Sequence, residues 1–328
     1  MAPAPDPGAL VDGIVAGDRR ALARAITLTE STRADHRDAA DAVLHTLLPR
    51  TGTATRIGIS GPPGVGKSTF IEAFGSHVID QGNQLAVLAV DPSSRRTGGS
   101  ILGDKTRMEE LSRRTEAFIR PSPGGDHLGG VARRTREAML LCEAFGFDVV
   151  VVETIGVGQS EVAVADMVDL FTLLVAPGGG DELQGIKRGI MELADLVVVN
   201  KADGELAAAA GRTRSDYAAA VHLLRPKWRS WAPEVLACSA LDGKGIAEVW
   251  EAAERFRADV EASGELATTR AEQSRAWLWS EVGDSLLDRF RADPAVQALL
   301  HGIEDDVTAG RTTPTAGARR LLDAFHAE

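Results

Sequence analysis

The stretch Gly61-Pro62-Pro63-Gly64-Val65-Gly66-Lys67-Ser68-Thr69 decides the fold of this chain of 328 residues. It fits the phosphate-binding pattern G-x-x-x-x-G-K-[ST], in which glycines let the backbone curl until its N–H groups point at phosphate oxygens. A strand-like run at 56–60 precedes the stretch, and a helix-like run at 70–80 follows it. Because a phosphate-binding loop needs this strand-loop-helix context, the sequence predicts a nucleoside-triphosphate site on an α/β fold.

The side chains and the main chain of this loop have separable roles. Lys67 supplies a mobile positive charge to the β- and γ-phosphates, and the Ser68 hydroxyl is placed to ligate Mg²⁺. The helix that opens near Gly66 adds free N–H groups and its dipole. The residues expected to contact the nucleotide are Gly61, Gly64, Val65, Gly66, Lys67, Ser68 and Thr69.

Strand-like and helix-like runs alternate along the chain around this loop. Continuous apolar runs such as 149–152 and 196–199 are typical of strands covered on both faces, which predicts a mostly parallel sheet flanked by helices. Ligands of such sheets bind at the carboxyl ends of the strands. The expected strands are 56–60, 85–90, 117–119, 148–153, 170–175, 196–200 and 235–239.

Helical patterns flank this central domain on both sides. Apolar residues recur at helical spacing before residue 50, and a long helix is expected from Glu265 to about Ala292, followed by two shorter ones. We therefore predict an N-terminal helical extension at 1–52, a P-loop nucleotide domain at 53–262 and a C-terminal helical segment at 263–328.

Carboxylates follow two of the expected strands. Asp91 can reach the water shell of Mg²⁺ or the attacking water, although a surface turn is the alternative at its Asp-Pro step. Glu153 ends a strand with Gly156 three residues on, which fits a Mg²⁺-side carboxylate and an amide aimed at the γ-phosphate. Common small GTPases place a water-orienting Gln directly after this glycine, but here Val157 follows. We expect hydrolysis to be slow alone and to depend on a partner.

The choice of base is indicated by Asn200-Lys201-Ala202-Asp203. The Asp203 carboxylate can accept from the ring N–H and the exocyclic amino group of guanine, and adenine lacks both donors, a difference of roughly 2–5 kcal/mol. The stem of Lys201 would cover one face of the base, and Asn200 would tie the loops together. The later run Ser239-Ala240-Leu241 would aim a backbone N–H at the guanine oxygen. GTP and GDP are the predicted ligands.

Two glycine-rich segments, 95–107 and 177–187, remain. We expect them to be mobile loops whose order depends on the γ-phosphate. Asp104 is a candidate Mg²⁺ ligand, while Arg107 and Lys187 are candidates to neutralise charge in the transition state. A solvated loop residue is the alternative for each.

Composition excludes other classes of protein. The net charge of −11 argues against general nucleic-acid binding, and no apolar run approaches the roughly 20 residues of a membrane span. The N-terminus lacks the pattern of a secretory signal, and Cys142 and Cys238 are expected to be buried hydrophobes, so we expect a cytoplasmic protein without nucleic-acid or membrane partners.

The motifs together resemble those of the methylmalonyl-CoA mutase-associated GTPases, metallochaperone GTPases of the group that also contains the signal-recognition and nickel-insertion GTPases. The resemblance covers most of the central domain. It is carried by GPPGVGKST (61–69), VDPSSRRTGGSILGDKTRM (90–108), RPSPGGDHLGGVARRTREA (120–138), VVVETIGVGQSE (151–161), PGGGDELQGIKRGIMELAD (177–195) and NKAD (200–203).

The resemblance implies a function that the residues alone do not. Such GTPases bind adenosylcobalamin-dependent acyl-CoA mutases, gate cofactor delivery with GTP and protect the mutase, and the adenosyltransferase is a further candidate partner. They are homodimers joined through C-terminal helices, which makes 53–262 the expected P-loop GTPase domain and 263–328 the expected dimerisation segment. The family pattern gives Mg²⁺-side roles to carboxylates matching Asp91, Asp104 and Glu153, and makes 178–187 a switch that responds to the mutase. Adenosylcobalamin would be held by the partner.

Three other readings remain open. One is a P-loop kinase or ATPase linked to amino-acid transport, which Asp203 disfavours by selecting guanine. The second is a GTPase chaperone of another metalloenzyme, for which a Cys- or His-rich tract would be expected and is absent from the sequence. The third is a binding module that holds GTP as a structural ligand.

Overall fold

The computed structural model describes residues 5–31, 33–90, 108–122, 128–154, 160–178 and 188–325. Two compact units make up the chain, Met1–Gln273 and Ser274–Glu328. The first unit holds the sheet and every described part of the expected nucleotide site.

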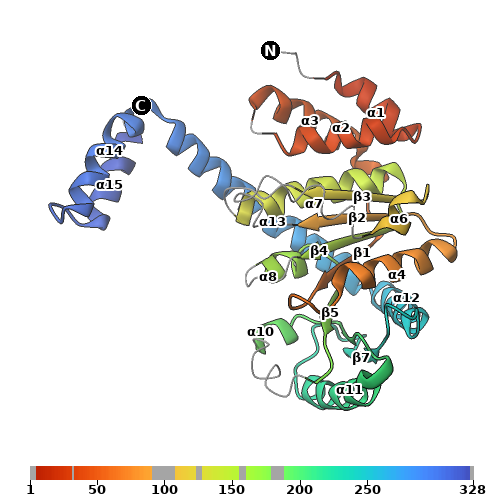
Figure 1. The fold of residues 1–328 in the computed structure, drawn as a ribbon. Coiled ribbons are helices and arrows are strands. Elements are labelled where there is room, and N and C mark those ends of the chain that lie inside the picture. The colour runs from red at the N-terminus through yellow and green to blue at the C-terminus, as the bar shows by residue number, and fades with distance from the viewer. Residues whose placement is uncertain are drawn as a thin grey trace. The chain divides into compact units, whose positions relative to one another are not determined.

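A seven-stranded parallel sheet forms the centre of the first unit, in the order β3-β2-β4-β1-β5-β6-β7 (Figure 1). All seven expected strands are present, so the predicted α/β fold with a parallel sheet is confirmed. Their bounds are β1 Thr55–Ser60, β2 Leu85–Val90, β3 Ala117–Ser122, β4 Val149–Thr154, β5 Leu170–Val175, β6 Leu196–Val199 and β7 Glu234–Ala237.

Strand β3 is longer than the sequence predicts. We expected it to end at Ile119, but Pro121 pairs with Ala89 and Ser122 with Val90 of β2. Proline removes a hydrogen-bond donor and is tolerated in a strand at the edge of a sheet, which is where β3 lies. The predicted end of this strand at residue 119 is therefore wrong, because β3 continues to Ser122.

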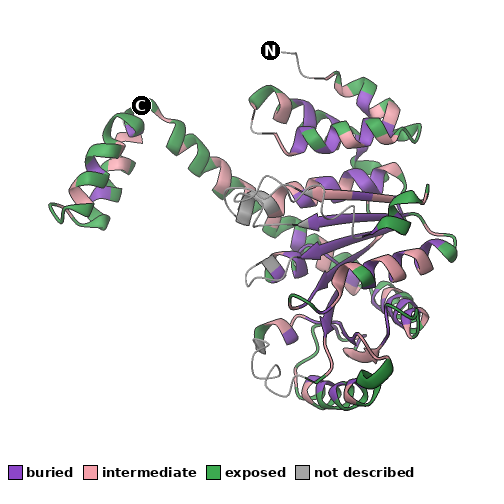
Figure 2. Cartoon of the chain, viewed as in Figure 1, coloured by how far each residue is buried: buried purple, intermediate pink, exposed green. Residues whose placement is uncertain are grey.

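Helices cover both faces of the sheet. On one face, α4 and α12 bury aromatic side chains such as Phe74 and Phe256 against the sheet, whose five inner strands are buried along most of their length (Figure 2). The helices of this unit are α1 Pro7–Val15, α2 Arg19–Thr29, α3 Ala34–Leu47, α4 Lys67–Asp80, α6 Glu109–Arg113, α7 Leu128–Phe145, α8 Ser160–Ala165, α10 Arg188–Met191, α11 Ala207–His222, α12 Ile246–Ala262 and the beginning of α13 Glu265–Ala292, with short 3-10 turns at Leu48–Arg50 and Gly204–Leu206.

The opposite face carries α7 and α8. Gly58 of β1 alternates with Ile57 and Ile59, which belong to the core beneath α4, so it faces the other way. A Cβ atom on Gly58 would lie 2.9 Å from Val164 of α8 and 3.0 Å from Val168. Glycine is required here because α8 lies directly on the strand that leads into the phosphate loop.

The N-terminal helices pack on α7 and protect the edge of the sheet. Arg19 of α2 donates to the carbonyl oxygen of Ala117, 2.6 Å away, and to that of Thr115. Arg120 of β3 forms an ion pair with Glu30 at 2.5 Å. These contacts cover an edge strand that could otherwise pair with another chain.

The second unit consists of helices. The later part of α13 is followed by α14 Pro294–Thr308 and α15 Pro314–Phe325. Asp293 caps α14 by accepting the N–H groups of Ala295 and Val296. The long helix begins and ends where the sequence predicts, at Glu265 and Ala292.

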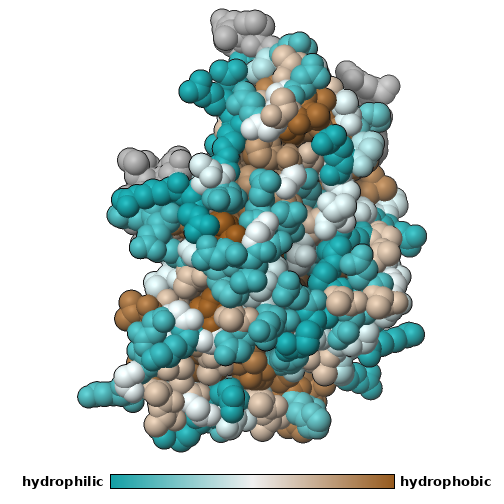
Figure 3. All heavy atoms as spheres, turned by 90° about the vertical axis from the view of Figure 1, so that its right-hand side faces the viewer, coloured by the Kyte–Doolittle hydropathy of each residue, from teal (hydrophilic) through white to brown (hydrophobic). Residues whose placement is uncertain are grey.

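Hydrophilic residues predominate on the face of the molecule shown in Figure 3, and hydrophobic ones form separate patches there. None of the described helices combines the length and the apolarity that crossing a bilayer demands.

Candidate functional site

The predicted phosphate loop joins β1 to α4 at the carboxyl end of the sheet. Strand β1 ends at Ser60 and α4 begins at Lys67. Between them Gly64 and Gly66 adopt φ values of 82° and 91°, in the left-handed region that other residues rarely enter. A Cβ atom on Gly66 would lie 3.0 Å from the amide nitrogen of Asn200. Glycine therefore lets the loop turn. It also lets the predicted base-recognition segment, Asn200–Asp203, approach the loop.

Lys67 lies within the curl of this loop. Its Nζ donates to the carbonyl oxygens of Gly61 and Pro62, at 2.6 and 3.2 Å. Burial lowers the pKa of the Lys67 ammonium, while the nearby carboxylates of Glu153 and Glu161 act in the opposite direction. The ammonium thus lies where phosphate oxygens could replace these two carbonyl oxygens as acceptors of its hydrogen bonds.

A candidate Mg²⁺ site is formed at the ends of β4 and β1. Glu153 is buried at the end of β4, and Ser68 lies in the first turn of α4. The Thr154 hydroxyl donates to Ser60 Oγ over 2.8 Å and ties the two strand ends together. The Ser68 hydroxyl and the Glu153 carboxylate offer hard oxygen atoms, the donors that Mg²⁺ prefers, so these residues fit that ion.

The base-recognition segment is hydrogen-bonded to the phosphate loop. Asn200 donates to the carbonyl oxygen of Val65 at 3.0 Å and accepts the N–H of Ala240 at 3.1 Å. Lys201, which has a φ of 59°, donates from Nζ to the carbonyl oxygen of Gly64 at 2.6 Å. Asn200 therefore connects all three segments that the sequence assigns to the nucleotide.

Asp203 is held in place by the third segment. Its Oδ2 accepts the Ser239 hydroxyl at 2.6 Å, and Ser239 Oγ in turn accepts the N–H of Asp242 at 3.1 Å. This orients the carboxylate expected to read guanine. The Ala240 N–H, part of the run expected to face the guanine oxygen, donates to Asn200 in this structure.

A hollow of about 570 Å³ lies beside these groups. It is bordered by Thr69 and the following turns of α4 on one side and by Ala240 and Leu241 on the other. Leu241 is 81% exposed. The hollow therefore adjoins Thr69 at the end of the phosphate-loop motif and the run that begins at Ala240, but neither Lys67 nor Asp203 lines it.

Five predicted site residues lie outside the described residues: Asp91, Asp104, Arg107, Gly156 and Lys187. The structure does not test their roles. The beginning of the segment that leads to Lys187 is anchored, since the Gly178 N–H donates to Thr213 Oγ1 of α11 at 3.3 Å.

The sequence analysis overlooked Glu161, which is only 4% exposed. Its signal in the sequence is weak, because it is a single acidic residue in the first turn of α8. Its burial in the same structural neighbourhood as Lys67 distinguishes it from a solvated helix residue.

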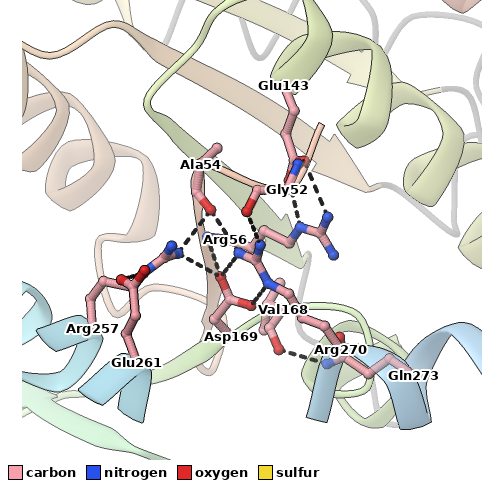
Figure 4. A network of polar contacts seen from close by, with 10 residues as sticks. All are labelled: Gly52, Ala54, Arg56, Glu143, Val168, Asp169, Arg257, Glu261, Arg270 and Gln273. Atoms are coloured by element: carbon pink, nitrogen blue, oxygen red, sulfur yellow. Dashed lines mark hydrogen bonds and ion pairs between the residues drawn. The ribbon is translucent and has the colours of Figure 1, made fainter. Parts of the chain in front are cut away.

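The sequence analysis also overlooked a polar network at the amino ends of β1 and β5, opposite the nucleotide site (Figure 4). Asp169, buried before β5, accepts from Arg270 of α13 at 2.6 and 2.8 Å and from the Arg56 N–H at 2.9 Å. Arg56 in turn pairs with Glu143 of α7 at 2.5 Å. The network ties α7 and α13 to the two strands that lead to the phosphate loop and to Gly178.

Comparisons with known proteins identify the family of this chain. The family model described as methylmalonyl-CoA mutase-associated GTPase MeaB matches residues 22–295. GTPase ArgK of Escherichia coli is 48% identical over 94% of this chain and 93% of its own. The mouse protein named methylmalonic aciduria type A homolog, mitochondrial, is 49% identical over 96% of this chain and 79% of its own.

A solved structure described as LAO/AO transport system kinase superposes with a TM-score of 0.75 at 39% identity and covers 98% of both chains. The fold of this chain is thus shared with that protein. Because the family match spans most of its length, this chain belongs to the methylmalonyl-CoA mutase-associated GTPase family MeaB.

Proposed function

We propose that this GTPase gates the delivery of adenosylcobalamin to an acyl-CoA mutase, in the first instance methylmalonyl-CoA mutase, and protects that enzyme from inactivation. The family is associated with methylmalonyl-CoA mutase by its description, and the mouse relative is named for methylmalonic aciduria. The observation that carries the choice of GTP is the Asp203 carboxylate, which Ser239 holds at 2.6 Å. The adenosyltransferase is a second candidate partner.

The proposed nucleotide chemistry follows from the loop. Backbone N–H groups of the phosphate loop and the Lys67 ammonium bind the β- and γ-phosphates, and these electrostatic contacts supply most of the catalysis of phosphoryl transfer. Bound Mg²⁺ would neutralise charge that develops on the phosphates. Ser68 and Glu153 would hold this ion, with Asp91 and Asp104 as further candidates from the sequence.

Hydrolysis is proposed to be slow alone and to be stimulated by the partner. The residue after Gly156 is Val157, so the chain lacks a water-orienting Gln at that place. Arg107 and Lys187 are the candidates from the sequence to neutralise transition-state charge when the mutase binds. A partner-dependent rate would let the hydrolysis of GTP report that a mutase is engaged.

A homodimer formed through the C-terminal helices is proposed as the functional state. Large apolar side chains are exposed on α13, among them Leu278 at 61% and Trp279 at 68%. Contiguous exposed apolar surface marks interaction sites in soluble proteins. A second copy of the chain is the proposed occupant of this face.

The second candidate is a kinase or ATPase linked to amino-acid transport, which the description of the similar solved structure favours. Asp203 argues against it, since its carboxylate matches two donors of guanine that adenine lacks. Turnover of ATP in preference to GTP would establish this candidate instead.

The deciding experiment measures GTP hydrolysis with and without a purified adenosylcobalamin-dependent acyl-CoA mutase, with ATP as the control nucleotide. Stimulation specific to GTP supports the proposal, and its absence against a normal basal rate removes the mutase as partner. Lys67→Ala should abolish GTP hydrolysis and the gating of cobalamin transfer together. Normal gating by that variant would refute the nucleotide switch.

A further inference from the structure

The turn that follows β7 folds back onto the end of that strand. The Ser239 N–H donates to the carbonyl oxygen of Lys244 at 2.8 Å, and the two residues form an isolated antiparallel bridge. Gly245 comes next and begins α12 with a φ of 76°. A Cβ atom on Gly245 would overlap the carbonyl oxygen of Ala237 and lie 2.9 Å from the Cα atom of Cys238. The backbone of Gly245 therefore lies closer to the end of β7 than any larger residue would allow.

The residues beside this close contact hold the base-recognition segment. Three consecutive residues, 238–240, each form a hydrogen bond with a different residue of Asn200–Asp203. Because these bonds start from the end of β7 and from the turn after it, the position of the turn decides where the segment is held. The contacts join the Cys238 carbonyl oxygen to the Ala202 N–H at 2.9 Å, the Ser239 hydroxyl to Asp203 Oδ2 at 2.6 Å, and the Ala240 N–H to Asn200 Oδ1 at 3.1 Å.

Helix α12 is fixed on the other side of Gly245. Its first residues Ile246 and Val249 are only 3% and 2% exposed and belong to the core of the sheet. Trp250 packs edge-on against Phe74 of α4, with 5.9 Å between the ring centroids. Protein cores are close-packed, so the helix has little room to move. The residues 241–244 of the turn are exposed, so a bulkier residue at position 245 would displace the turn rather than the helix.

We propose that Gly245 is a positioning residue for recognition of the base: its close contact with the end of β7 sets the place of Ser239, and through it the direction in which the Asp203 carboxylate faces the nucleotide. The inference rests on the proposed guanine site. Asp203 has to align with two donors of guanine, and hydrogen bonds weaken steeply as their angles depart from linearity. A displaced turn would therefore reduce the preference for guanine and leave the phosphate loop around Lys67 unchanged.

The test measures equilibrium binding of GDP and of inosine diphosphate to the wild type and to Gly245→Ala. Inosine diphosphate keeps the ring N–H and lacks the exocyclic amino group, so the wild type should prefer GDP by about ten- to hundredfold, as expected for one hydrogen bond to a charged acceptor. In Gly245→Ala this preference should fall to about threefold or less, because the second hydrogen bond loses its geometry. If both nucleotides bind more weakly by the same factor, Gly245 supports the fold alone and the proposal fails.

Gly243→Ala is the matched control. Gly243 lies in the same turn with a φ of 72°, so alanine there is strained in the same way, but a Cβ atom would meet nothing within 4 Å. This variant should keep the preference for GDP within about a factor of two, because the strain is local to an exposed residue. An equal loss of preference in both variants would assign the effect to backbone strain rather than to the close contact, and would overturn the proposal.

Hydrogen exchange on the unaltered chain tests the same idea if Gly245→Ala does not fold. The turn is proposed to be in place before the nucleotide arrives. In the nucleotide-free wild type, the amides of Ser239 and Ala240 should therefore exchange on the order of a hundredfold more slowly than in an unstructured peptide. Exchange at the rate of an unstructured peptide would show that the turn is not held, and would contradict the proposal.

The wild type separates this inference from the proposed function. Equal binding of GDP and inosine diphosphate by the wild type would remove the assignment of guanine to Asp203, and this inference with it. A wild type that prefers GDP, together with a Gly245→Ala variant that keeps the same preference, would leave the guanine site standing and remove only the role of Gly245.

Discussion

Arg270 and Asp169 form a bidentate ion pair although they lie 101 positions apart in the sequence. Arg270 Nε donates to Asp169 Oδ1 at 2.8 Å, and its terminal nitrogen donates to Oδ2 at 2.6 Å. The same guanidinium also donates to the carbonyl oxygen of Ala54, 2.7 Å away. One side chain thereby fixes the beginning of α13 to the amino ends of β1 and β5, and Asp169 is only 1% exposed.

Arg270→Ala should destabilise the first unit strongly. The substitution leaves the Asp169 carboxylate buried with less compensation, and breaking a buried pair costs about 3–5 kcal/mol. Arg257, at 3.8 Å from Asp169, offsets part of that cost. Denaturant unfolding measures the loss. The exposed Arg275→Ala on the same helix is the control, with an expected change within about 0.5 kcal/mol. A similar small change for Arg270→Ala would show that the pair is dispensable.

Asp203→Asn should reduce the affinity for GTP by roughly 2–5 kcal/mol, because the amide presents one acceptor and one donor to two donors of guanine. Xanthosine triphosphate carries a carbonyl oxygen where guanine has its amino group, so it should bind the variant better than GTP does. Equilibrium binding of both nucleotides checks this. A variant that keeps its preference for GTP would place the base elsewhere.

Ser239→Ala tests the same recognition of guanine with a smaller perturbation. It removes the hydrogen bond that holds Asp203 at 2.6 Å but keeps the carboxylate. Loss of one such bond is expected to cost about 0.5–1.5 kcal/mol of GTP binding. The preference for GTP over xanthosine triphosphate should survive in this variant.

The meeting of the phosphate loop with the segment at 200–203 could be predicted from the sequence because both motifs are local. Lys67 and Asn200 each follow a strand that an apolar run reveals, and parallel strands bring such ends together. The end of β3 could not be predicted, because Pro121 indicates a loop until its place at the edge of the sheet is known. Nor could the pair of Asp169 and Arg270, since no local pattern relates residues so distant in sequence.

The burial of Glu161 lies between these cases. Its position in α8 follows from the βα rhythm, but its burial depends on the close approach that Gly58 permits. The predicted domain boundaries, at 52 and 262, stay predictions, as do the roles of the site residues outside the described part of the chain.

Glu265 provides a prediction about pH. Hydrogen bonds from the Ser230 hydroxyl and from the Arg229 N–H lower the pKa of this carboxyl to about 2. A carboxyl whose pKa is lower in the folded state stabilises the fold above its unfolded pKa of about 4.3, and this contribution is lost as the pH falls toward 2. Carbon NMR of the Glu265 carboxyl should give a midpoint near the lower value.

Glu265→Gln should correspondingly flatten the dependence of unfolding free energy on pH between about 4.3 and the folded pKa. The wild type loses stability over this interval as the carboxyl becomes protonated, whereas the amide does not titrate. If the wild type and the variant lose stability in parallel, the interaction with Ser230 and Arg229 does not favour the ionised form.

The proposed homodimer can be tested on the exposed face of α13. Leu278, Val282 and Leu286 follow one another at intervals of four residues and so share one side of the helix, with Trp279 beside them. Removing apolar area from an interface loses about 25 cal/mol per Å², so Trp279→Ser combined with Leu286→Ser should raise the dimer dissociation constant at least about a hundredfold. Sedimentation velocity over a range of concentrations measures this. Asp288→Ser, which the helical period places on the other side of α13, should leave the constant unchanged. If the double variant remains dimeric with an unaltered constant while its helices stay folded, the second copy binds elsewhere and the apolar face of α13 must serve a different partner.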